Sequence, residues 1–400
     1  MKCDAIVLGG GPAGSTCARF LRLAGWSVVV VDRATFPRDK VCAGWLTPGI
    51  FPLLDLNPAE YRAAGLTLQE IQSFRTGLIT REHTTRDVPM LETHYPTVVS
   101  YAIRRCEFDH FLLQRAGVRV LEGTSASSIQ RVGDKWIVND NVEAPVIIGA
   151  GGHFCPVARH LRGSADTSAP IVAKEAEFRV GARDGLTDAA PELLFCRDME
   201  GYGWCVRKGD YLNVGLGRRA SRDFAEHLRN FITLLEQSGR LAPGKEIKWR
   251  GHAYFASGVG PRPLIGPGAL TVGDSAGLAY PESGEGIQPA IASGRLAAET
   301  LIEADGRYGV ADLQRYADAL TRLHPPASRP SASIRTASAA LGRALLSSSL
   351  FTRHVLLDRW FLRSHCLEPL RGATDNTSHG QHGQHRLRLA AENTDSTDNI

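Results

Sequence analysis

The chain carries little net charge for its 400 residues and contains no run of five consecutive lysines or arginines. Its net charge of +4 therefore does not suggest a surface for nucleic acid. No apolar run approaches the roughly 18–20 residues that span a bilayer. The apolar N-terminal residues lead directly into glycines, unlike a signal peptide. We therefore expect a cytoplasmic protein that binds no nucleic acid.

Cysteine and histidine patterns typical of metal sites are also missing. The eight cysteines are scattered and contain no C-x-x-C pair, so we expect reduced thiols, several of them packed as small apolar side chains. His153, His252 and His354 have no ligand or nucleophile at a suggestive spacing. We predict no metal site. The 43% hydrophobic and 22% charged residues are typical of a globular protein, and the length allows two or three structural units.

A glycine-rich turn between two apolar segments is the strongest local signal in the chain. Residues 5–8 indicate a buried strand, residues 9–14 read Gly-Gly-Gly-Pro-Ala-Gly, and the apolar spacing at 17–24 predicts a helix. A second apolar strand at 28–31 ends at Asp32, whose carboxylate can accept hydrogen bonds from ribose hydroxyls. This strand–turn–helix–strand–acid order is the fingerprint of a dinucleotide-binding unit.

Each glycine of the turn has its own steric purpose in such a unit. Gly9 permits the tight turn, Gly11 lets the backbone approach a pyrophosphate, and Gly14 allows close packing of helix on strand. Pro12 and Ala13 open the helix, whose first N–H groups attract negative charge. The segment 149–152, Gly-Ala-Gly-Gly, is not interpreted as a second fingerprint, because it lacks the third glycine and Pro156 disfavours an opening helix.

The remainder of the chain suggests an interrupted nucleotide-binding domain. Alternating residues over 170–255 predict an antiparallel sheet, whereas 270–274 returns to the buried-strand pattern and a helix is expected from about 287 to 304. The pattern from about 312 to 370 is helical, and the polar stretch that follows predicts disorder. We expect a first nucleotide-binding part at 1–165, a substrate domain at 166–255, a second nucleotide-binding part at 256–305, a helical segment at 306–371 and a disordered tail at 372–400.

Three further motifs carry a resemblance to a known family. Residues 36–44, Phe-Pro-Arg-Asp-Lys-Val-Cys-Ala-Gly, resemble a Lys-x-Cys-Gly-Gly segment, with Ala43 in place of the first glycine. Residues 105–109 match an Arg-x-x-Phe-Asp segment, and 273–287 match a second FAD motif. With the glycine turn, these motifs resemble flavoproteins of the para-hydroxybenzoate hydroxylase structural group, and within it the geranylgeranyl reductase family. The family's Gly-Ala-Asp-Gly element is represented only by the Gly-Ala-Gly-Gly at 149–152, without the aspartate.

The resemblance implies an α/β fold: a Rossmann-like FAD-binding domain, an inserted antiparallel-sheet substrate domain and a C-terminal helical segment. Physically, the Asp274 carboxylate can accept bonds from ribityl hydroxyls, and the helix beginning near Gly286 would favour negative charge on a flavin pyrimidine ring. The residues predicted to contact FAD are Gly9, Gly11, Pro12, Ala13, Gly14, Asp32, Arg33, Cys42, Ala43, Arg105, Gly273, Asp274, Gly286 and Ile287.

A substrate pocket is predicted over the flavin. Residues 202–207, Tyr-Gly-Trp-Cys-Val-Arg, resemble the family's Tyr-x-Trp-x-Phe-Pro segment, and alternation places Tyr202 and Trp204 on one side of a strand. They can form an apolar wall for a prenyl chain, or simply pack in the core. An arginine at position 207 that faced the pocket would prefer an anionic or polar group. Cys42 is interpreted as a small packed residue beside the flavin rather than as a redox thiol.

The resemblance implies an FAD-dependent oxidoreductase that reduces carbon–carbon double bonds of a prenyl or isoprenoid substrate, with NADPH or a reduced electron carrier as reductant. No catalytic residue is assigned. One alternative is an FAD-dependent monooxygenase of the same fold. Another is a flavoprotein that acts as a maturation factor or accessory protein for another protein.

The segment 340–367 combines leucines and aromatic residues with arginines at 343, 353, 359 and 363. Such a basic amphipathic segment can pack on the domain beneath it or lie at a membrane interface. We favour packing, and keep peripheral membrane contact as the alternative, because the substrate is expected to be a lipid. The oligomeric state is not predicted.

Overall fold

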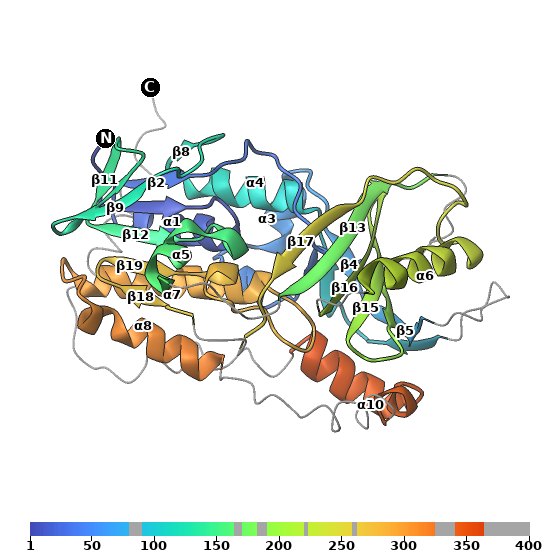
Figure 1. Cartoon of the computed structure of the whole chain (residues 1–400). Coiled ribbons are helices and arrows are strands. Elements are labelled where there is room, and N and C mark those ends of the chain that lie inside the picture. The colour runs from blue at the N-terminus through green and yellow to red at the C-terminus, as the bar shows by residue number, and fades with distance from the viewer. Residues whose placement is uncertain are drawn as a thin grey trace.

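The computed structural model describes residues 1–79, 90–163, 170–181, 190–219, 223–257, 262–324 and 341–363. Within these ranges, no helix is both long and apolar enough to cross a membrane. The expected disorder of 372–400 lies outside them. Two large sheets dominate the architecture, one at each end of the view in Figure 1.

The first sheet has six strands in the order β18-β19-β12-β1-β2-β8, and all neighbours are parallel except β18 and β19. Four-residue strands such as β1 and β2 are buried along their whole length, which accounts for their unbroken apolar sequences. Both match the predicted strands at 5–8 and 28–31. The strands are β1 (Ala5–Leu8), β2 (Val28–Val31), β8 (Arg119–Leu121), β12 (Val146–Gly149), β18 (Ile265–Gly266) and β19 (Ala269–Thr271).

Helices cover both faces of this sheet. On one face α1 (Pro12–Leu23) packs against α4 (Arg105–Ala116) and α7 (Ile287–Ala304), and α8 (Val310–Leu323) packs against α7. The other face is covered by α5 (Pro156–Arg162) and a small sheet, whose Trp136 belongs to the same apolar cluster as Ile6. The predicted helix at 287–304 is confirmed. The small sheet consists of β9 (Ile129–Val132), β10 (Lys135–Val138) and β11 (Val142–Ala144).

The second sheet has seven strands in the order β17-β13-β16-β15-β14-β5-β6, and only the β14–β5 pair is parallel. It confirms the antiparallel sheet predicted within 170–255, and it also includes two strands from the stretch 1–165. One face is covered by α6 (Phe224–Gln237). The strands are β5 (Ser73–Leu78), β6 (Leu91–His94), β13 (Ile171–Arg179), β14 (Glu192–Phe195), β15 (Gly201–Lys208), β16 (Tyr211–Arg219) and β17 (Arg250–Tyr254).

Smaller elements lie between the two sheets. They are the sheet of β3 (Trp45–Leu46), β4 (Gln69–Ile71) and β7 (Ser100–Ala102), the helices α2 (Ile50–Leu53) and α3 (Pro58–Ala63), and the 3-10 turns η1 (Gly152–Phe154) and η2 (Gly273–Ser275). α2, α3 and α4 share one apolar cluster that includes Tyr61 and Phe108. This cluster ties the small elements to the nucleotide-binding side of the molecule.

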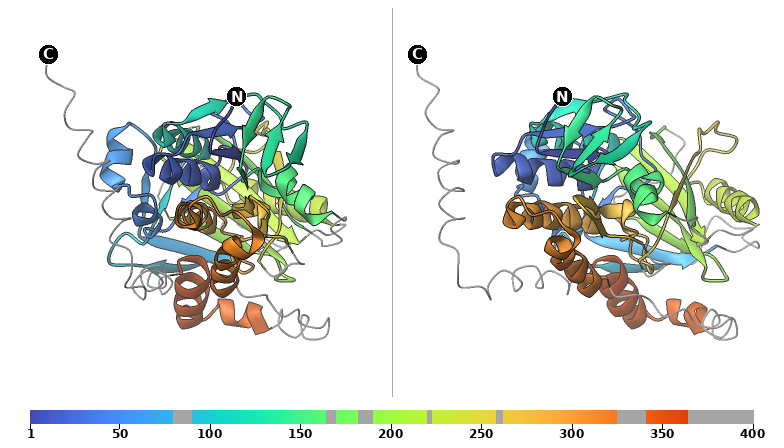
Figure 2. Two further views of the ribbon diagram at one scale, coloured as in Figure 1. Left: turned by 90° about the vertical axis from the view of Figure 1, so that its left-hand side faces the viewer. Right: turned by 60° about the vertical axis from the view of Figure 1, so that its left-hand side comes forward.

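The C-terminal part of the described chain is helical, as predicted for 312–370: residues 341–346, α10 (Ser349–Phe351) and the π-helical η3 (Thr352–Phe361) follow α8. These helices lie apart from the parallel sheet in all three views (Figures 1 and 2). Leu356, Leu357 and Phe361 pack in one cluster with Trp204 of β15. The favoured packing interpretation is therefore confirmed for the buried side chains of this segment, Leu346, Leu356, Leu357, Phe361 and Leu362.

Candidate active site

A continuous cleft of about 1620 Å³ runs from the glycine turn to the aromatic residues of the second sheet. It is larger than the roughly 300–1,000 Å³ of most small-molecule pockets. The cleft is lined both by Asp32, which follows β2, and by Asp274, which lies in η2 after β19. The cleft therefore has space for an extended cofactor and a second ligand.

The β1–α1 turn forms one end of the cleft. Gly9 has φ +116°, and a Cβ there would lie 2.6 Å from the carbonyl carbon of Ala150. A Cβ on Gly14 would overlap the carbonyl oxygen of Gly9, so both positions require glycine. Among the described residues, a Cβ on Gly11 would meet only the Arg38 guanidinium, at 3.3 Å. The backbone at Gly11 is therefore open toward the cleft, as pyrophosphate binding requires.

Asp32 holds this turn against the second strand. Its Oδ2 accepts the N–H of Gly10 at 2.7 Å, and its Oδ1 accepts the N–H of Ala34 at 2.8 Å. The side chain is buried at the end of β2 and still lines the cleft. Each carboxylate oxygen has a second lone pair, so Asp32 can also accept a ribose hydroxyl. Arg33, Pro12 and Ala13 lie along the same wall.

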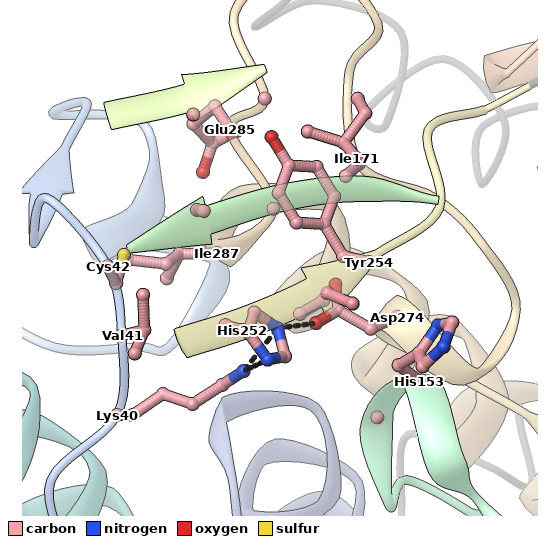
Figure 3. Close-up of a pocket in the computed structure, with 18 of the residues that line it drawn as sticks. Lys40, Val41, Cys42, His153, Ile171, His252, Tyr254, Asp274, Glu285 and Ile287 are labelled. Carbon is pink, nitrogen blue, oxygen red and sulfur yellow. Dashed lines mark hydrogen bonds and ion pairs between the residues drawn. The ribbon is translucent and has the colours of Figure 1, made fainter. Parts of the chain in front are cut away.

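Asp274 lies in the turn η2 at the end of the strand β19 and pairs with His252, which Lys40 also contacts (Figure 3). His252 Nε2 is 3.6 Å from Asp274 Oδ2, and Lys40 Nζ is 2.6 Å from His252 Nε2. Burial opposes the charge of Asp274, but the hydrogen bond from His252 and the charge of Lys40 outweigh it and lower its pKa to about 2. Burial lowers the pKa of both Lys40 and His252. Asp274 is therefore ionised at neutral pH.

The start of helix α7 lies beside this carboxylate. A Cβ on Gly286, the N-cap, would be 3.3 Å from Asp274 Oδ1, and Ile287 forms the first turn. Glu285 precedes the helix, and its Oε1 accepts the N–H of Gln288 at 2.7 Å. Gly273, with φ +58°, brings the preceding strand against the same helix. The predicted residues of the second FAD motif thus share one wall of the cleft.

The loop around Cys42 also lines the cleft, next to Ile287 (Figure 3). The Cys42 N–H donates to Glu175 Oε2 at 2.6 Å, and Ala43 lines the cleft beside it. Arg105 makes a two-pronged ion pair with Asp109, at 2.7 and 2.8 Å. Burial opposes the charge of Arg105, but Asp109 raises its pKa, so the guanidinium stays charged at the cleft.

Tyr202 and Trp204 lie on one face of β15 and line the far end of the cleft, as alternation predicted. The Trp204 indole N–H donates to Asn213 Oδ1 at 2.7 Å, and the Tyr202 hydroxyl donates to the carbonyl of Ser283. Arg207 is not among the residues that line the cleft. Because side chains alternate, Val206 shares the face of Trp204, while Arg207 Nε bonds the carbonyl of Gly209.

Several cleft residues have no counterpart among the predicted site residues. The C-terminal helices contribute an apolar wall, and the centroid of the Phe361 ring is 5.3 Å from that of Tyr202. Lys40 stands in the quoted Lys-x-Cys motif, but nothing in the local sequence links His252 to Asp274. The C-terminal residues that line the cleft are Gly342, Leu346, Phe351, Leu356, Trp360 and Phe361.

The segment after β12 also reaches the cleft, at Gly151 and Gly152. Contrary to the expectation, a helix does open at Pro156, because proline occupies the first position of α5, where no N–H donor is needed. The third glycine position of the fingerprint is occupied by Phe154. Among the described residues, no group of three or more histidine, cysteine or acidic side chains could hold a metal ion.

Comparison with known proteins identifies the family to which this fold and site belong. A sequence-family model described as FAD dependent oxidoreductase matches residues 4–90. Geranylgeranyl diphosphate reductase of Rhodobacter capsulatus is 30% identical over 319 residues, which cover 75% of each chain. Digeranylgeranylglycerophospholipid reductase 2 of Methanosphaera stadtmanae is 27% identical over 335 residues, 79% of this chain and 82% of that one. The chain belongs to the geranylgeranyl reductase family of FAD-dependent oxidoreductases.

Solved structures agree with the fold. A geranylgeranyl bacteriochlorophyll reductase-like protein of Thermoplasma acidophilum superposes with a TM-score of 0.64 at 21% identity, covering 87% of this chain and 88% of that chain. A flavin-dependent brominase superposes with a TM-score of 0.66 at 18% identity, covering 99% of both. At these identities the similarity shows the fold alone.

Proposed function

We propose that the cleft binds one extended FAD and that the enzyme uses it to reduce carbon–carbon double bonds of a prenyl-type substrate. The observation that carries this proposal is the continuity of the cleft from the glycine turn, past Asp274, to the aromatic wall at Tyr202 and Trp204. Its relatives are named for reduction of geranylgeranyl chains, which fits an apolar wall beside a flavin site.

The residues present fit FAD. Helix α1 has no side-chain cap at Gly11, so its first N–H groups are available for a pyrophosphate. Asp32 would hold the adenosine ribose, and Asp274, ionised and close to Lys40, would hold the ribityl chain. Bound FAD would supply the hydride-transfer chemistry that these side chains cannot. We assign the fourteen predicted contact residues to it, because all of them line the cleft except Gly14, which supports the turn.

The second sheet and the C-terminal helices would bind the substrate. Their aromatic side chains exclude water and favour an isoprenoid chain through burial of apolar area. Most of the apolar C-terminal residues face inward, but Leu341 and Leu350 are 60% and 71% exposed. With Arg353 close by in sequence, they would suit peripheral contact with the membrane that carries a lipid substrate. The reductant would be NADPH or a reduced electron carrier.

The test is the visible spectrum of the purified protein, before and after anaerobic reduction by NADPH or dithionite. We expect a bound, reducible flavin that geranylgeranyl diphosphate reoxidises without oxygen, giving a product with two additional hydrogens per reduced double bond. Reoxidation only by oxygen, with an oxygen atom inserted into the substrate, would show a monooxygenase instead. A chain without a reducible flavin would support the accessory-protein alternative.

A further inference from the structure

Glu285 has two carboxylate oxygens in different surroundings. Its Oε1 accepts the N–H of Gln288 at 2.7 Å, which fixes the side chain against the first turn of α7. Its Oε2 is buried and has no hydrogen-bond partner among the residues that the structure describes. A buried carboxylate oxygen without a donor is costly when the group is ionised, but a protonated oxygen carries a hydrogen that it can give away.

Glu285 lies between the part of the cleft that is predicted to bind FAD and the part that Tyr202 and Trp204 line. Figure 3 shows the carboxyl group directed toward the space that Cys42 and Tyr254 also face. Two residues earlier, the carbonyl of Ser283 accepts the hydroxyl of Tyr202, which belongs to the substrate wall. Glu285 therefore lies where the second FAD motif meets the aromatic wall.

We propose that Glu285 is the acid that protonates the substrate alkene. This proposal rests on the proposed function. One alkene carbon accepts a hydride from the reduced flavin, and the neighbouring carbon accepts the proton of the Glu285 carboxyl group. The π bond breaks and two C–H bonds form, so the alkene is reduced and the flavin oxidised. The Glu285 carboxylate then regains a proton from water in the cleft.

The surroundings keep a large fraction of Glu285 protonated near neutral pH. Burial is the largest influence and raises its pKa to about 7, and the charge of Asp274 acts in the same direction. The backbone N–H groups of α7 and the charge of Arg363 act in the opposite direction. Tyr202 and Tyr254 also face it, but burial raises the pKa of both phenols, so they stay neutral. Asp274 itself is ionised and cannot donate.

The test replaces the acid by its amide in the flavin-loaded enzyme. Glu285→Gln keeps an oxygen for the Gln288 N–H but has no acidic proton. We expect anaerobic reduction by dithionite and binding of geranylgeranyl diphosphate to stay unchanged, whereas reoxidation by that substrate slows about 100-fold to 10,000-fold. In the wild type this rate should fall tenfold per pH unit above about pH 7, and in the variant the dependence should vanish.

Glu285→Asp should restore part of the rate and its pH dependence. Glu282→Gln, in the same loop but ion-paired to Arg363, should keep a pH dependence, with its midpoint moved to lower pH because Arg363 loses its partner.

A measurement without turnover accompanies these rates. The infrared difference between wild type and Glu285→Gln should contain a protonated-carboxyl band at pH 5.5 that disappears at pH 8.5. Absence of that band at pH 5.5, or equal reoxidation rates and pH profiles in wild type and Glu285→Gln, would overturn the proposal while leaving the proposed function intact. Failure of the wild-type enzyme to be reoxidised by any prenyl substrate would overturn the proposed function, and this step with it.

Discussion

The substrate wall can be disturbed without touching the cleft itself. Gly215 of β16 lies directly beneath Trp204 and does not line the cleft. A Cβ at this position would lie 2.5 Å from the indole Cε2 and closer still to Cζ2, and 2.9 Å from the carbonyl oxygen of Lys174. Gly217, two residues along the same strand, offers a control for the packing, because its Cβ would contact the same ring at an ordinary 3.5 Å, although Gly217 itself lines the cleft.

The expected cost of Gly215→Ala has two parts. Forcing a methyl group into a packed site costs about 1–3 kcal/mol. The indole must move, so the bond from Trp204 Nε1 to Asn213 Oδ1 is lost, and leaving such buried partners unpaired costs about 1–3 kcal/mol more. We therefore expect a total near 2–6 kcal/mol. Gly217→Ala should stay close to the wild type, since neither ring nor backbone has to move.

The assay is thermal unfolding of the flavin-loaded variants together with binding of a prenyl ligand. Gly215→Ala should lower the melting temperature by several degrees and weaken prenyl binding about tenfold or more, while Gly217→Ala should leave the melting temperature unchanged. Trp204→Phe removes the indole atoms that the new methyl meets, so Gly215→Ala should cost much less in that background. Equal melting temperatures and affinities for the two alanine variants would refute this account of the wall.

Three further predictions concern the cofactor end, pH and the C-terminal wall. Gly11→Ala should fold normally, because its Cβ meets only the Arg38 guanidinium, but bind FAD at least tenfold more weakly by equilibrium dialysis; unchanged FAD affinity would contradict the assignment of the turn. Folding lowers the pKa of Asp274 to about 2, so its carboxylate stabilises the native state by about 2 kcal/mol above pH 4, and this contribution is lost as the pH falls toward 2. The stability difference between wild type and Asp274→Asn in denaturant titrations should therefore shrink on acidification; a constant difference would contradict the shift. Phe361→Ala should weaken prenyl binding while the purified protein keeps its flavin, since this ring packs against Tyr202 at the far end of the cleft. A loss of flavin with unchanged prenyl binding would show that the ring belongs to the flavin site instead.

The nucleotide-binding part was predictable because its signals are local. The positive φ at Gly9 and the packing at Gly14 each require glycine at a position set by the chain itself. The buried strands at 5–8 and 28–31 are continuous apolar runs, and the helix at 287–304 begins directly after a glycine. The sequence also predicts the face of β15 on which Arg207 lies. Because side chains alternate, Tyr202 and Trp204 on one face place residue 207 on the other.

Long-range neighbours were not predictable in the same way. The strand β5 pairs with β14, more than a hundred residues later, and no local pattern selects that partner. Likewise, His252 gains its neighbour Asp274 only when β17 crosses beside the parallel sheet. For the C-terminal helices, one property was predictable and the other was not. Their apolar spacing indicated a packed helix, but which surface they cover depends on how well their side chains fit against Tyr202 and Trp204.

A buried hydrogen-bond network connects Trp204 in the substrate wall to the loop beside the predicted flavin site. This connection extends the expected effect of Gly215→Ala. Asn213 Oδ1 accepts the Trp204 indole N–H, and its Nδ2 lies 3.3 Å from Glu175 Oε2. The same Glu175 oxygen accepts the N–H of Cys42, in the loop beside the predicted flavin site. Because partners in a buried network cannot be displaced singly without leaving polar groups unpaired, moving the indole should also move this loop. We therefore expect Gly215→Ala to weaken FAD binding as well as prenyl binding, although residue 215 belongs to the second sheet.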